Sequence, residues 1–303
     1  MGNKRIIIQE DNVMSFEQSL IKVIDAQVRQ EKIQIGSYSI NSIHAGSGEP
    51  VLLIHGLNIG WGQWYKNIAK LAENNSIYAI DLPGSGASTK KSFFDIGLND
   101  YVNVVDEYIK KKRLEKLTII AHSFGAWVAL KLAIEKRSYL KKLILVDPFG
   151  FTNYIPLTQR PISIRPFATF ISTSVMKPSR KNLKNFLRST MQDEVMLAED
   201  FFSYYHQSVN RGMVTHPLMM MSSLSRLFKL REEIVLKDDL AKIKLPVLVI
   251  MGEKDKIIPI KTIINEVGRF PSAELKVIEG VGHVPSLEKS EEFNNIISEF
   301  IYS

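Results

Sequence analysis

The sequence predicts an α/β fold: a mostly parallel sheet flanked by helices, with an inserted helical cap domain. Short continuous apolar runs such as "VLLIH" and "LILVD" are typical of strands that are covered on both faces. Helical stretches separate these runs, which indicates right-handed crossovers between parallel strands. The alternation stops near residue 148 and resumes with "LPVLVIMG" at residues 245–252, so a helical segment interrupts the domain.

The expected boundaries follow from this interruption. Residues 1–147 form the first part of the core, residues 148–240 the helical cap, and residues 241–303 the second part of the core. An apolar stripe (Phe16, Leu20, Val23 and Ile24) predicts an N-terminal amphipathic helix at about residues 15–30. "KIQIGSYSINSIHAG" alternates like a β-hairpin. Further strands are expected at "SIYAID", "LTIIAH" and "AELKVIEG", and a last helix from Ser290.

Composition excludes several classes of protein. Hydrophobic residues make up 45% and charged residues 23%, the balance of a soluble globular chain. The net charge is +7, but lysines occur along the whole chain, so we expect a solvated basic surface and no nucleic-acid partner. The absence of cysteine excludes disulfides and thiolate chemistry. No signal-peptide core and no apolar run near 20 residues is found, so a cytoplasmic protein without stable membrane insertion is expected.

The stretch "IIAHSFGAWV" at residues 119–128 places Ser123 between a predicted strand and a predicted helix. A sharp turn there exposes the serine at the carboxyl edge of the sheet, and the small residues Ala121 and Gly125 let strand and helix approach. The motif reads A-x-S-x-G rather than G-x-S-x-G. The alternative interpretation is that Ser123 is an ordinary helix N-cap.

A nucleophilic serine needs a base, and the base needs an acid that fixes its tautomer. His283 lies in "EGVGHVPSLE" and Asp255 in "MGEKDKIIP", each after a predicted strand. Because carboxyl ends of parallel strands share one edge, we expect both side chains near Ser123. Asp147, at the end of "LILVD", is the best rival acid. We expect His122 to be a packing residue pointing away from the site, and His55 and Asp81 to stabilise their loops.

Five landmarks in this order resemble the α/β-hydrolase superfamily with a cap domain. They are "HG" at 55–56, "DLPGSG" at 81–86, "HSFG" at 122–125, "GEKD" at 252–255 and "GHVP" at 282–285. The resemblance covers about residues 33–303 and implies the catalytic set Ser123, Asp255 and His283. It also implies an oxyanion hole formed by the backbone N–H groups of Leu57 and Phe124. The adjacent Asn58 is a further candidate for substrate binding.

The insert contains seven of the ten methionines, and with "FFSYY" at 201–205 these predict either an apolar substrate lining or the insert's own core. Phe149 and Met219 are the substrate-binding candidates from this region. The cap histidines His206 and His216 lack ligand-spaced companions, and "GSGAS" at 84–88 lacks the P-loop lysine. We therefore expect no metal and no cofactor.

These observations favour a serine hydrolase that cleaves carboxylic esters of moderately hydrophobic small molecules through an acyl-enzyme. Within the family, the alternatives are hydrolysis of a carbon–carbon bond in a vinylogous diketone and proline-iminopeptidase-like action. The peptidase needs cap carboxylates for an ammonium group, for which Asp193, Glu194, Glu232 and Glu233 are candidates. The alternative of another class is a non-catalytic protein that binds a small ligand on the same fold.

Overall fold

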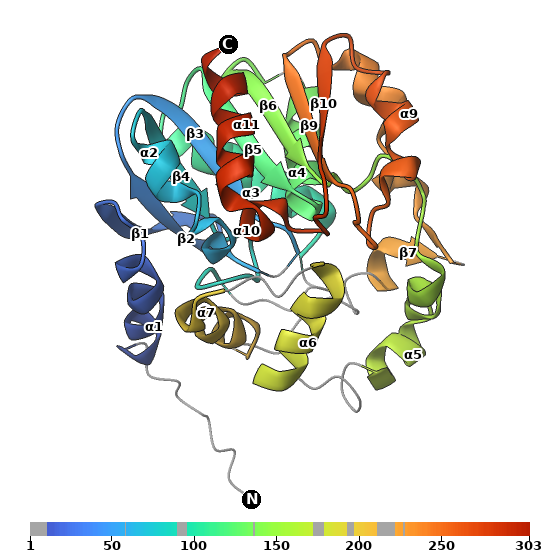
Figure 1. The fold of residues 1–303 in the computed structure, drawn as a ribbon, viewed down its shortest axis with the longest axis horizontal. Coiled ribbons are helices and arrows are strands. Elements are labelled where there is room, and N and C mark those ends of the chain that lie inside the picture. Colours follow the sequence, from blue (N-terminus) through green and yellow to red (C-terminus); the bar gives the residue numbers. More distant parts are fainter. Residues whose placement is uncertain are drawn as a thin grey trace, which may run out of the picture.

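The computed structural model describes residues 11–57, 59–89, 96–135, 137–171, 179–192, 197–210, 222–226 and 228–303. An eight-stranded sheet lies at its centre, in the order β1-β2-β4-β3-β5-β6-β9-β10 (Figure 1). These strands are β1 (Val28–Ile35), β2 (Tyr38–Ala45), β3 (Glu49–Ile54), β4 (Asn75–Ile80), β5 (Leu117–His122), β6 (Leu140–Val146), β9 (Val247–Gly252) and β10 (Ala273–Ile278).

The sheet is mostly parallel, as the sequence predicts. β1 and β2 form the expected antiparallel hairpin, and β2 also pairs antiparallel with β4. Every other neighbouring pair is parallel, from β4 through β3, β5, β6 and β9 to β10. Each residue of β5 and β9 is buried, which explains why these strands are continuous apolar runs rather than alternating ones. The predicted fold class is confirmed.

Helices cover both faces of the sheet and create two apolar cores. In β3, Leu52 and Ile54 belong to the core under α3 (Leu98–Lys111) and α4 (Phe124–Ile134). Val51 and Leu53 belong to the opposite core, under α2 (Ile68–Ala72) and α11 (Ser290–Tyr302). Figure 1 shows α11 crossing in front of the sheet, with α3 and α4 behind it. The start of the last helix at Ser290 agrees with the sequence prediction.

Shorter elements beside the core strands are the 3₁₀ helices η1 (Trp61–Trp64) and η7 (Ile260–Thr262), with α9 (Ile264–Val267) and α10 (Pro285–Glu288). The chain between β6 and β9 forms η3 (Leu157–Ser163), α5 (Arg165–Phe170), α6 (Arg180–Thr190), α7 (Glu199–Asn210), the two-residue strands β7 (Ser225–Arg226) and β8 (Lys229–Leu230), and the 3₁₀ helices η5 (Glu232–Ile234) and η6 (Lys237–Lys242). In Figure 1, α5, α6 and α7 lie together below the sheet. Within the described residues, no helix combines the length and apolar character needed to cross a bilayer.

The N-terminal helix differs from the sequence prediction. α1 spans Asp11–Lys22, not residues 15–30. The chain leaves the helix because residues from Val28 onward are held in the sheet, where Val28 pairs with Ala45 of β2. Leu20 and Ile24 are buried as the stripe predicts, whereas Val23 lies beyond the helix end and is exposed.

A buried carboxylate fastens α1 to the core. Glu17 is almost fully buried, and its Oε1 accepts hydrogen bonds from Trp61 Nε1 and Asn41 Nδ2, both at 2.9 Å. Asn41 Nδ2 also donates to Asp81 at 2.7 Å, and Asp81 accepts a second hydrogen bond from the backbone N–H of Trp61. On its other side α1 packs against α7, so this helix joins the core to the segment between β6 and β9.

We predict that Glu17→Ala lowers the free energy of unfolding. The substitution leaves the indole N–H of Trp61 buried without an acceptor, which costs about 1–3 kcal/mol. Denaturant unfolding followed by circular dichroism measures the difference. Gln18→Ala is the matched control, because Gln18 is exposed on the same helix. Equal effects of the two substitutions would show that the Glu17 hydrogen bonds do not stabilise the fold.

Candidate active site

Ser123 lies between the last residue of β5 and the first residue of α4. Its backbone has φ 50° and ψ −115°, a conformation that L residues rarely adopt and that costs of order 1–3 kcal/mol. Ser123 occupies the N-cap position of α4, but its side chain makes no capping hydrogen bond. The N-cap interpretation therefore does not explain the residue. The hydroxyl is available for another partner.

The small residue at position 125 permits this tight turn. A Cβ on Gly125 would come within 2.5 Å of the His55 carbonyl oxygen and 2.8 Å of the Ile54 carbonyl oxygen. α4 therefore begins in direct contact with the end of β3, and a side chain at 125 would push them apart. Ala121, the other small neighbour, is fully buried.

The structure brings the three predicted side chains into one hydrogen-bonded chain. His283 Nε2 lies 3.2 Å from Ser123 Oγ, and His283 Nδ1 lies 2.7 Å from Asp255 Oδ2. All three residues are buried. Ser123 follows β5, Asp255 follows β9 and His283 follows β10, so one edge of the sheet presents all of them.

Asp255 is held by its own loop. Its Oδ1 accepts hydrogen bonds from the backbone N–H groups of Ile257 at 2.7 Å and Ile258 at 3.0 Å. These two donors stabilise a carboxylate at this position and leave Oδ2 to accept from His283. The arrangement fixes the direction of the carboxylate.

Asp147, the rival acid, lies directly beside Asp255. It follows β6, has a positive φ of 42° and is fully buried. Its Oδ1 accepts from the Gly252 N–H at 2.9 Å, and its side chain is within hydrogen-bonding reach of Asp255. Burial, together with the neighbouring Asp255 carboxylate, raises the pKa of Asp147 well above its usual value, which favours the protonated acid. The imidazole therefore pairs with Asp255, and Asp147 supports that carboxylate from behind.

His122 does not point away from the site, contrary to the sequence expectation. Its ring centroid lies 4.8 Å from that of His283, and its Nε2 lies 2.7 Å from the His283 carbonyl oxygen. A carbonyl only accepts, so Nε2 carries the proton and donates. Burial lowers the pKa of His122 well below its usual value, so the ring is neutral. Strand alternation misplaced this side chain because residue 122 is the last of β5, where the chain already turns.

Glu288 is a positioning residue that the sequence reasoning missed. Its Oε2 accepts from the N–H groups of Gly282 and Gln192, each at 2.9 Å. Its Oε1 accepts from the Val284 N–H at 3.0 Å. The carboxylate thus holds the backbone on both sides of His283 and ties that loop to the end of α6. The signal in the sequence was an acidic residue four positions after Val284, in the first turn of α10.

The loop after β3 lies against the serine. A Cβ on Gly56 would be 3.4 Å from Ser123 Cβ, so the neighbouring Leu57 is close to the nucleophile. His55 braces this loop as expected, since its Nε2 accepts from the Leu82 N–H at 2.9 Å and its Nδ1 lies 2.5 Å from the Gly56 carbonyl oxygen. Asn58 lies outside the described residues.

Phe124 begins α4, so its N–H has no acceptor within the helix. Because Phe124 directly follows Ser123, this free backbone donor lies next to the nucleophile. Asp81 stabilises its turn as expected, accepting from the Ala87 N–H at 2.8 Å. The same carboxylate also accepts from the backbone N–H of Trp61 at 2.7 Å, and this hydrogen bond links the turn to the loop after β3.

The insert supplies one residue next to the serine. The Phe149 N–H donates to the Ser123 carbonyl oxygen at 3.2 Å, and its ring centroid lies 6.5 Å from that of Phe124. Phe149 is partly exposed, as a substrate contact must be. Met219 and the cap histidine His216 lie outside the described residues. In "FFSYY", Phe201, Tyr204 and Tyr205 are buried in the core shared with α1, so these three residues form core rather than lining.

Among the described residues, His122, Asp147 and His283 bring ligand-type atoms within 4.8 Å of one another. Both ring nitrogens of His283 already face Ser123 and Asp255, and His122 Nε2 faces a carbonyl oxygen. Only His122 Nδ1 and Asp147 Oδ2 are left without a hydrogen-bond partner. Two atoms are fewer than the three or four protein ligands of a zinc site, so we assign no metal here.

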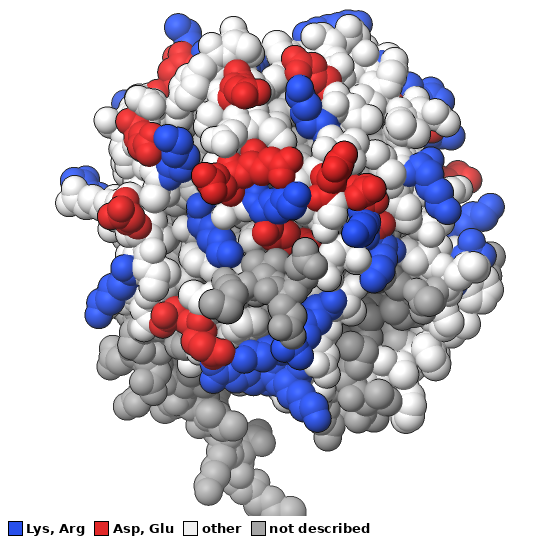
Figure 2. Space-filling model, in the orientation of Figure 1, with Lys and Arg blue, Asp and Glu red and all other residues white. Residues whose placement is uncertain are grey.

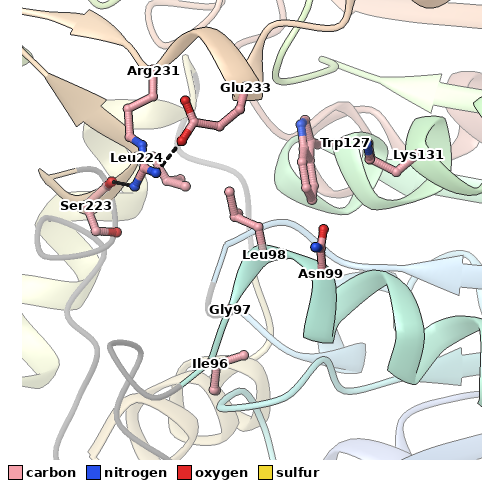
Figure 3. Close-up of a pocket in the computed structure, with 10 residues that line it drawn as sticks. All are labelled: Ile96, Gly97, Leu98, Asn99, Trp127, Lys131, Ser223, Leu224, Arg231 and Glu233. Carbon is pink, nitrogen blue, oxygen red and sulfur yellow. Dashed lines mark hydrogen bonds and ion pairs between the residues drawn. The ribbon is translucent and has the colours of Figure 1, made fainter.

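A pocket of about 530 Å³ lies behind the serine turn, in the size range of small-molecule sites. Figure 3 shows its walls, which come from the start of α3, from α4, and from the segment around β7 and η5. Trp127 lines it and also stacks on Phe124, with ring centroids 5.8 Å apart. Ser123, Asp255 and His283 do not line this pocket. Its residues are Ile96, Gly97, Leu98, Asn99, Trp127, Lys131, Ser223, Leu224, Arg231 and Glu233.

A parallel sheet with a serine at a strained strand–helix turn, and a histidine and an acid at neighbouring strand ends, defines an α/β hydrolase. Residues 49–290 match the family model described as "alpha/beta hydrolase fold". The chain belongs to this family.

Relatives of the chain include esterases and lipases. The putative esterase/lipase 2 of Mycoplasma pneumoniae is 25% identical over 253 residues, which is 82% of this chain and 88% of that protein. A putative lipase from Acinetobacter baumannii superposes with a TM-score of 0.78 at 21% identity, covering 99% of this chain and 98% of that one. The 2-hydroxy-6-oxo-6-phenylhexa-2,4-dienoate hydrolase of a Rhodococcus strain superposes at 0.76 and 22% identity, covering 92% and 100%. At these identities the two solved structures show a shared fold.

We predict that Asp147→Asn stabilises the protein increasingly as pH rises. An unfolded Asp loses its proton near pH 3.9, whereas folding raises the pKa of Asp147. Between these two pKa values the folded state holds a proton that the unfolded state has released, so the stability of the wild type falls with rising pH. Asparagine removes this cost and can still accept from Gly252.

Melting temperatures of wild type and variant, measured by circular dichroism from about pH 4 to about pH 8, give the difference. It should be small at the acid end and grow toward the alkaline end. Asp25→Asn is the control, because Asp25 is exposed and its difference should not change in this way. A pH-independent difference for Asp147→Asn would show that this carboxyl group is ionised in the folded protein.

Proposed function

We propose that the chain is a serine hydrolase that cleaves carboxylic esters of moderately hydrophobic substrates through an acyl-enzyme. The observation that supports this most is the continuous hydrogen-bonded chain from Ser123 Oγ through His283 to Asp255. The esterase or lipase names of its relatives point the same way. Hydrolase chemistry is supported by the family and by these names, and the ester bond is our specific proposal.

The tautomer of His283 suits a general base. Asp255 Oδ2 is an acceptor, so His283 Nδ1 carries the proton and donates to it. The lone pair of Nε2 then faces Ser123 Oγ and takes the hydroxyl proton as Oγ attacks the ester carbonyl carbon. The Asp255 carboxylate stabilises the imidazolium that forms. Asp147 keeps Asp255 in place without competing for the imidazole.

The backbone N–H groups of Leu57 and Phe124 are the proposed donors for the oxyanion of the tetrahedral intermediate. Phe124 N–H is free of helix bonding because of its position at the start of α4. Each donor of this kind is worth about 2.7–4 kcal/mol in the transition state. His55 and Asp81 hold the loop that carries Leu57, and so fix this donor from the side away from the substrate.

When the first tetrahedral intermediate breaks down, His283 acts as an acid instead of a base. The imidazolium of His283 gives its proton to the leaving alkoxide, and the alcohol departs. Neutral His283 then takes a proton from water as the water oxygen attacks the acyl-enzyme carbonyl carbon. When the bond from this carbon to Ser123 Oγ breaks, the imidazolium returns the proton to Oγ and the acid is released. We further propose that residues 148–240 form a cap over this edge of the sheet, since Phe149 and the end of α6 contact the candidate site.

The ester proposal is better supported than aminopeptidase action. A peptidase needs an unpaired carboxylate near the serine to hold the substrate ammonium. Glu232 is exposed, and Glu233 pairs with Arg231 at the pocket behind the turn. Asp193 and Glu194 lie outside the described residues.

A fluorophosphonate probe should label the wild type at Ser123, because His283 activates this hydroxyl. Ser123→Ala should lose both labelling and esterase activity on p-nitrophenyl esters, by about 10⁴-fold or more. A panel of p-nitrophenyl esters, proline anilide and a ring-fission dienone identifies the bond that is cleaved. Folded protein that is not labelled, or that binds small molecules without turnover, would contradict the proposal.

Replacing each of the two buried acids, Asp255 and Asp147, by asparagine distinguishes their roles. Asp255→Asn should lower kcat by about 10⁴-fold, because an amide favours the wrong tautomer of His283. Asp147→Asn should keep most of the activity, since the amide oxygen can still accept from the Gly252 N–H and the imidazole pairs with Asp255. Steady-state kinetics on one ester measures both. The reverse ranking would make Asp147 the acid of the catalytic set.

A further inference from the structure

The positive charge of the chain is concentrated in one segment. Residues 148–231 contain eleven Lys and Arg residues against four Asp and Glu, a net charge of +7, which equals that of the whole chain. The remainder is therefore neutral in sum. Lysines do occur throughout the sequence, but their excess over acids does not. All four acids lie at residues 193–200, so 148–192 and 201–231 are free of negative side chains.

The same segment exposes large apolar side chains. Ile164 is the N-cap of α5, and Phe167 and Phe170 lie within the helix. These three residues are spaced three apart, so they lie on one side of this short helix. That side faces solvent, whereas Ala168 is fully buried. Phe170 is 58% exposed and Leu157, at the start of η3, is 73% exposed.

The turn between β7 and β8 adds a fifth apolar side chain to this surface. Phe228 is exposed and has a positive φ of 67°, an unusual conformation for a bulky residue. Its N–H donates to Ser163 Oγ at 3.2 Å, which holds the turn against the junction of η3 and α5. Five of the nine large apolar residues that are exposed in the described part of the chain thus belong to one surface. We call it the η3–α5 surface: Leu157, Ile164, Phe167, Phe170 and Phe228.

Four exposed cations are close neighbours of the η3–α5 surface along the chain. Arg160 and Arg165 lie between its apolar residues along the chain, and Arg226 and Lys229 flank Phe228. All four side chains are exposed. Figure 1 places α5 at the rim of the molecule, at the same end as the basic helix α6. Figure 2 shows Lys and Arg side chains gathered at that end, where α6 lies.

We propose that the η3–α5 surface docks the protein on an anionic lipid bilayer. Aromatic and aliphatic side chains insert at the boundary between headgroups and acyl chains, while arginine and lysine contact the phosphates. A second copy of the chain is the less suitable partner. In a symmetric dimer this surface would meet itself and bring the like charges of its four cations together. The anionic bilayer supplies both an apolar layer and the opposite charge.

Docking of this kind goes beyond ester cleavage and does not depend on it. It would place the insert, and with it the edge of the sheet that presents Ser123, toward the membrane. Substrates dissolved in the bilayer would then reach the enzyme without passing through water.

Co-sedimentation of the full chain with vesicles tests the proposal, and Ser123→Ala is used so that lipid hydrolysis cannot interfere. Vesicles of phosphatidylcholine alone are compared with vesicles that also contain phosphatidylglycerol. We expect stronger binding to the anionic vesicles, weakened by salt because the arginines act through screened charge. Phe167→Ser with Phe170→Ser should lower the partition coefficient at least about tenfold for both vesicle types. Arg160→Gln with Arg165→Gln should lower it about 30-fold on anionic vesicles only.

Matched controls come from outside the η3–α5 surface, in and beside α9 and β10. Ile264→Ser with Val277→Thr replaces two exposed apolar residues, and Lys261→Gln with Lys276→Gln replaces two exposed cations. Both control variants should bind like the parent protein. Circular dichroism melting verifies that each variant is folded. Leu157→Ser, at the most exposed position, replaces the double phenylalanine variant if that variant does not fold.

Several outcomes would overturn the proposal. The parent protein could fail to bind anionic vesicles, or the phenylalanine and arginine variants could bind as well as the parent. Control variants that lose binding to the same extent would show general charge or apolar attraction. Sedimentation velocity that finds a dimer, dissociated by Phe167→Ser with Phe170→Ser, would show that a second copy covers the surface instead.

Discussion

The hydrogen bond between His283 and Asp255 is the interaction on which the candidate site depends. It sets which ring nitrogen faces Ser123, and a buried imidazole without it could turn or take the other tautomer. The surroundings of this bond all act to preserve it. Two backbone N–H groups fix the carboxylate, His122 holds the His283 carbonyl, and Glu288 holds the backbone on either side of the ring.

The position of this bond follows from the sheet. β5, β9 and β10 are parallel to their neighbours in the sheet, so the residues that follow them meet at one edge, although Ser123 and His283 are 160 residues apart in the chain. Apolar runs identify these strands in the sequence, because strands buried on both faces cannot alternate. Ser123, Asp255 and His283 could therefore be placed together from the sequence. The same reasoning predicted the order of the core helices and the hairpin of β1 and β2.

Interactions between parts of the chain that pack side by side were harder to predict. Nothing in the pattern at Glu17 shows that the side chain turns inward, since acids usually lie on the surface. At Glu288 the four-residue spacing from Val284 does not show which backbone groups the carboxylate holds. His122 was misplaced because alternation fails where a strand ends. The N-terminal helix was set too late because the apolar residue Val23 extends the stripe past the last helical turn. In each case a contact with a distant segment of the chain determines where the side chain points or where the helix ends. The local periodicity of the sequence does not show such a contact.

Gly282 lets the backbone at the end of α6 lie directly against the loop that carries His283. A Cβ on this residue would come within 2.4 Å of the Thr190 carbonyl oxygen, and the His283 N–H donates to that same oxygen at 2.9 Å. The backbone at the end of α6 and the backbone beside the imidazole are thus in contact with no side chain between them. A segment from another hydrolase that replaces the chain between β6 and β9 would have to reproduce this main-chain conformation. Otherwise the backbone of His283 would lose its hydrogen bond and the imidazole would no longer be held in position.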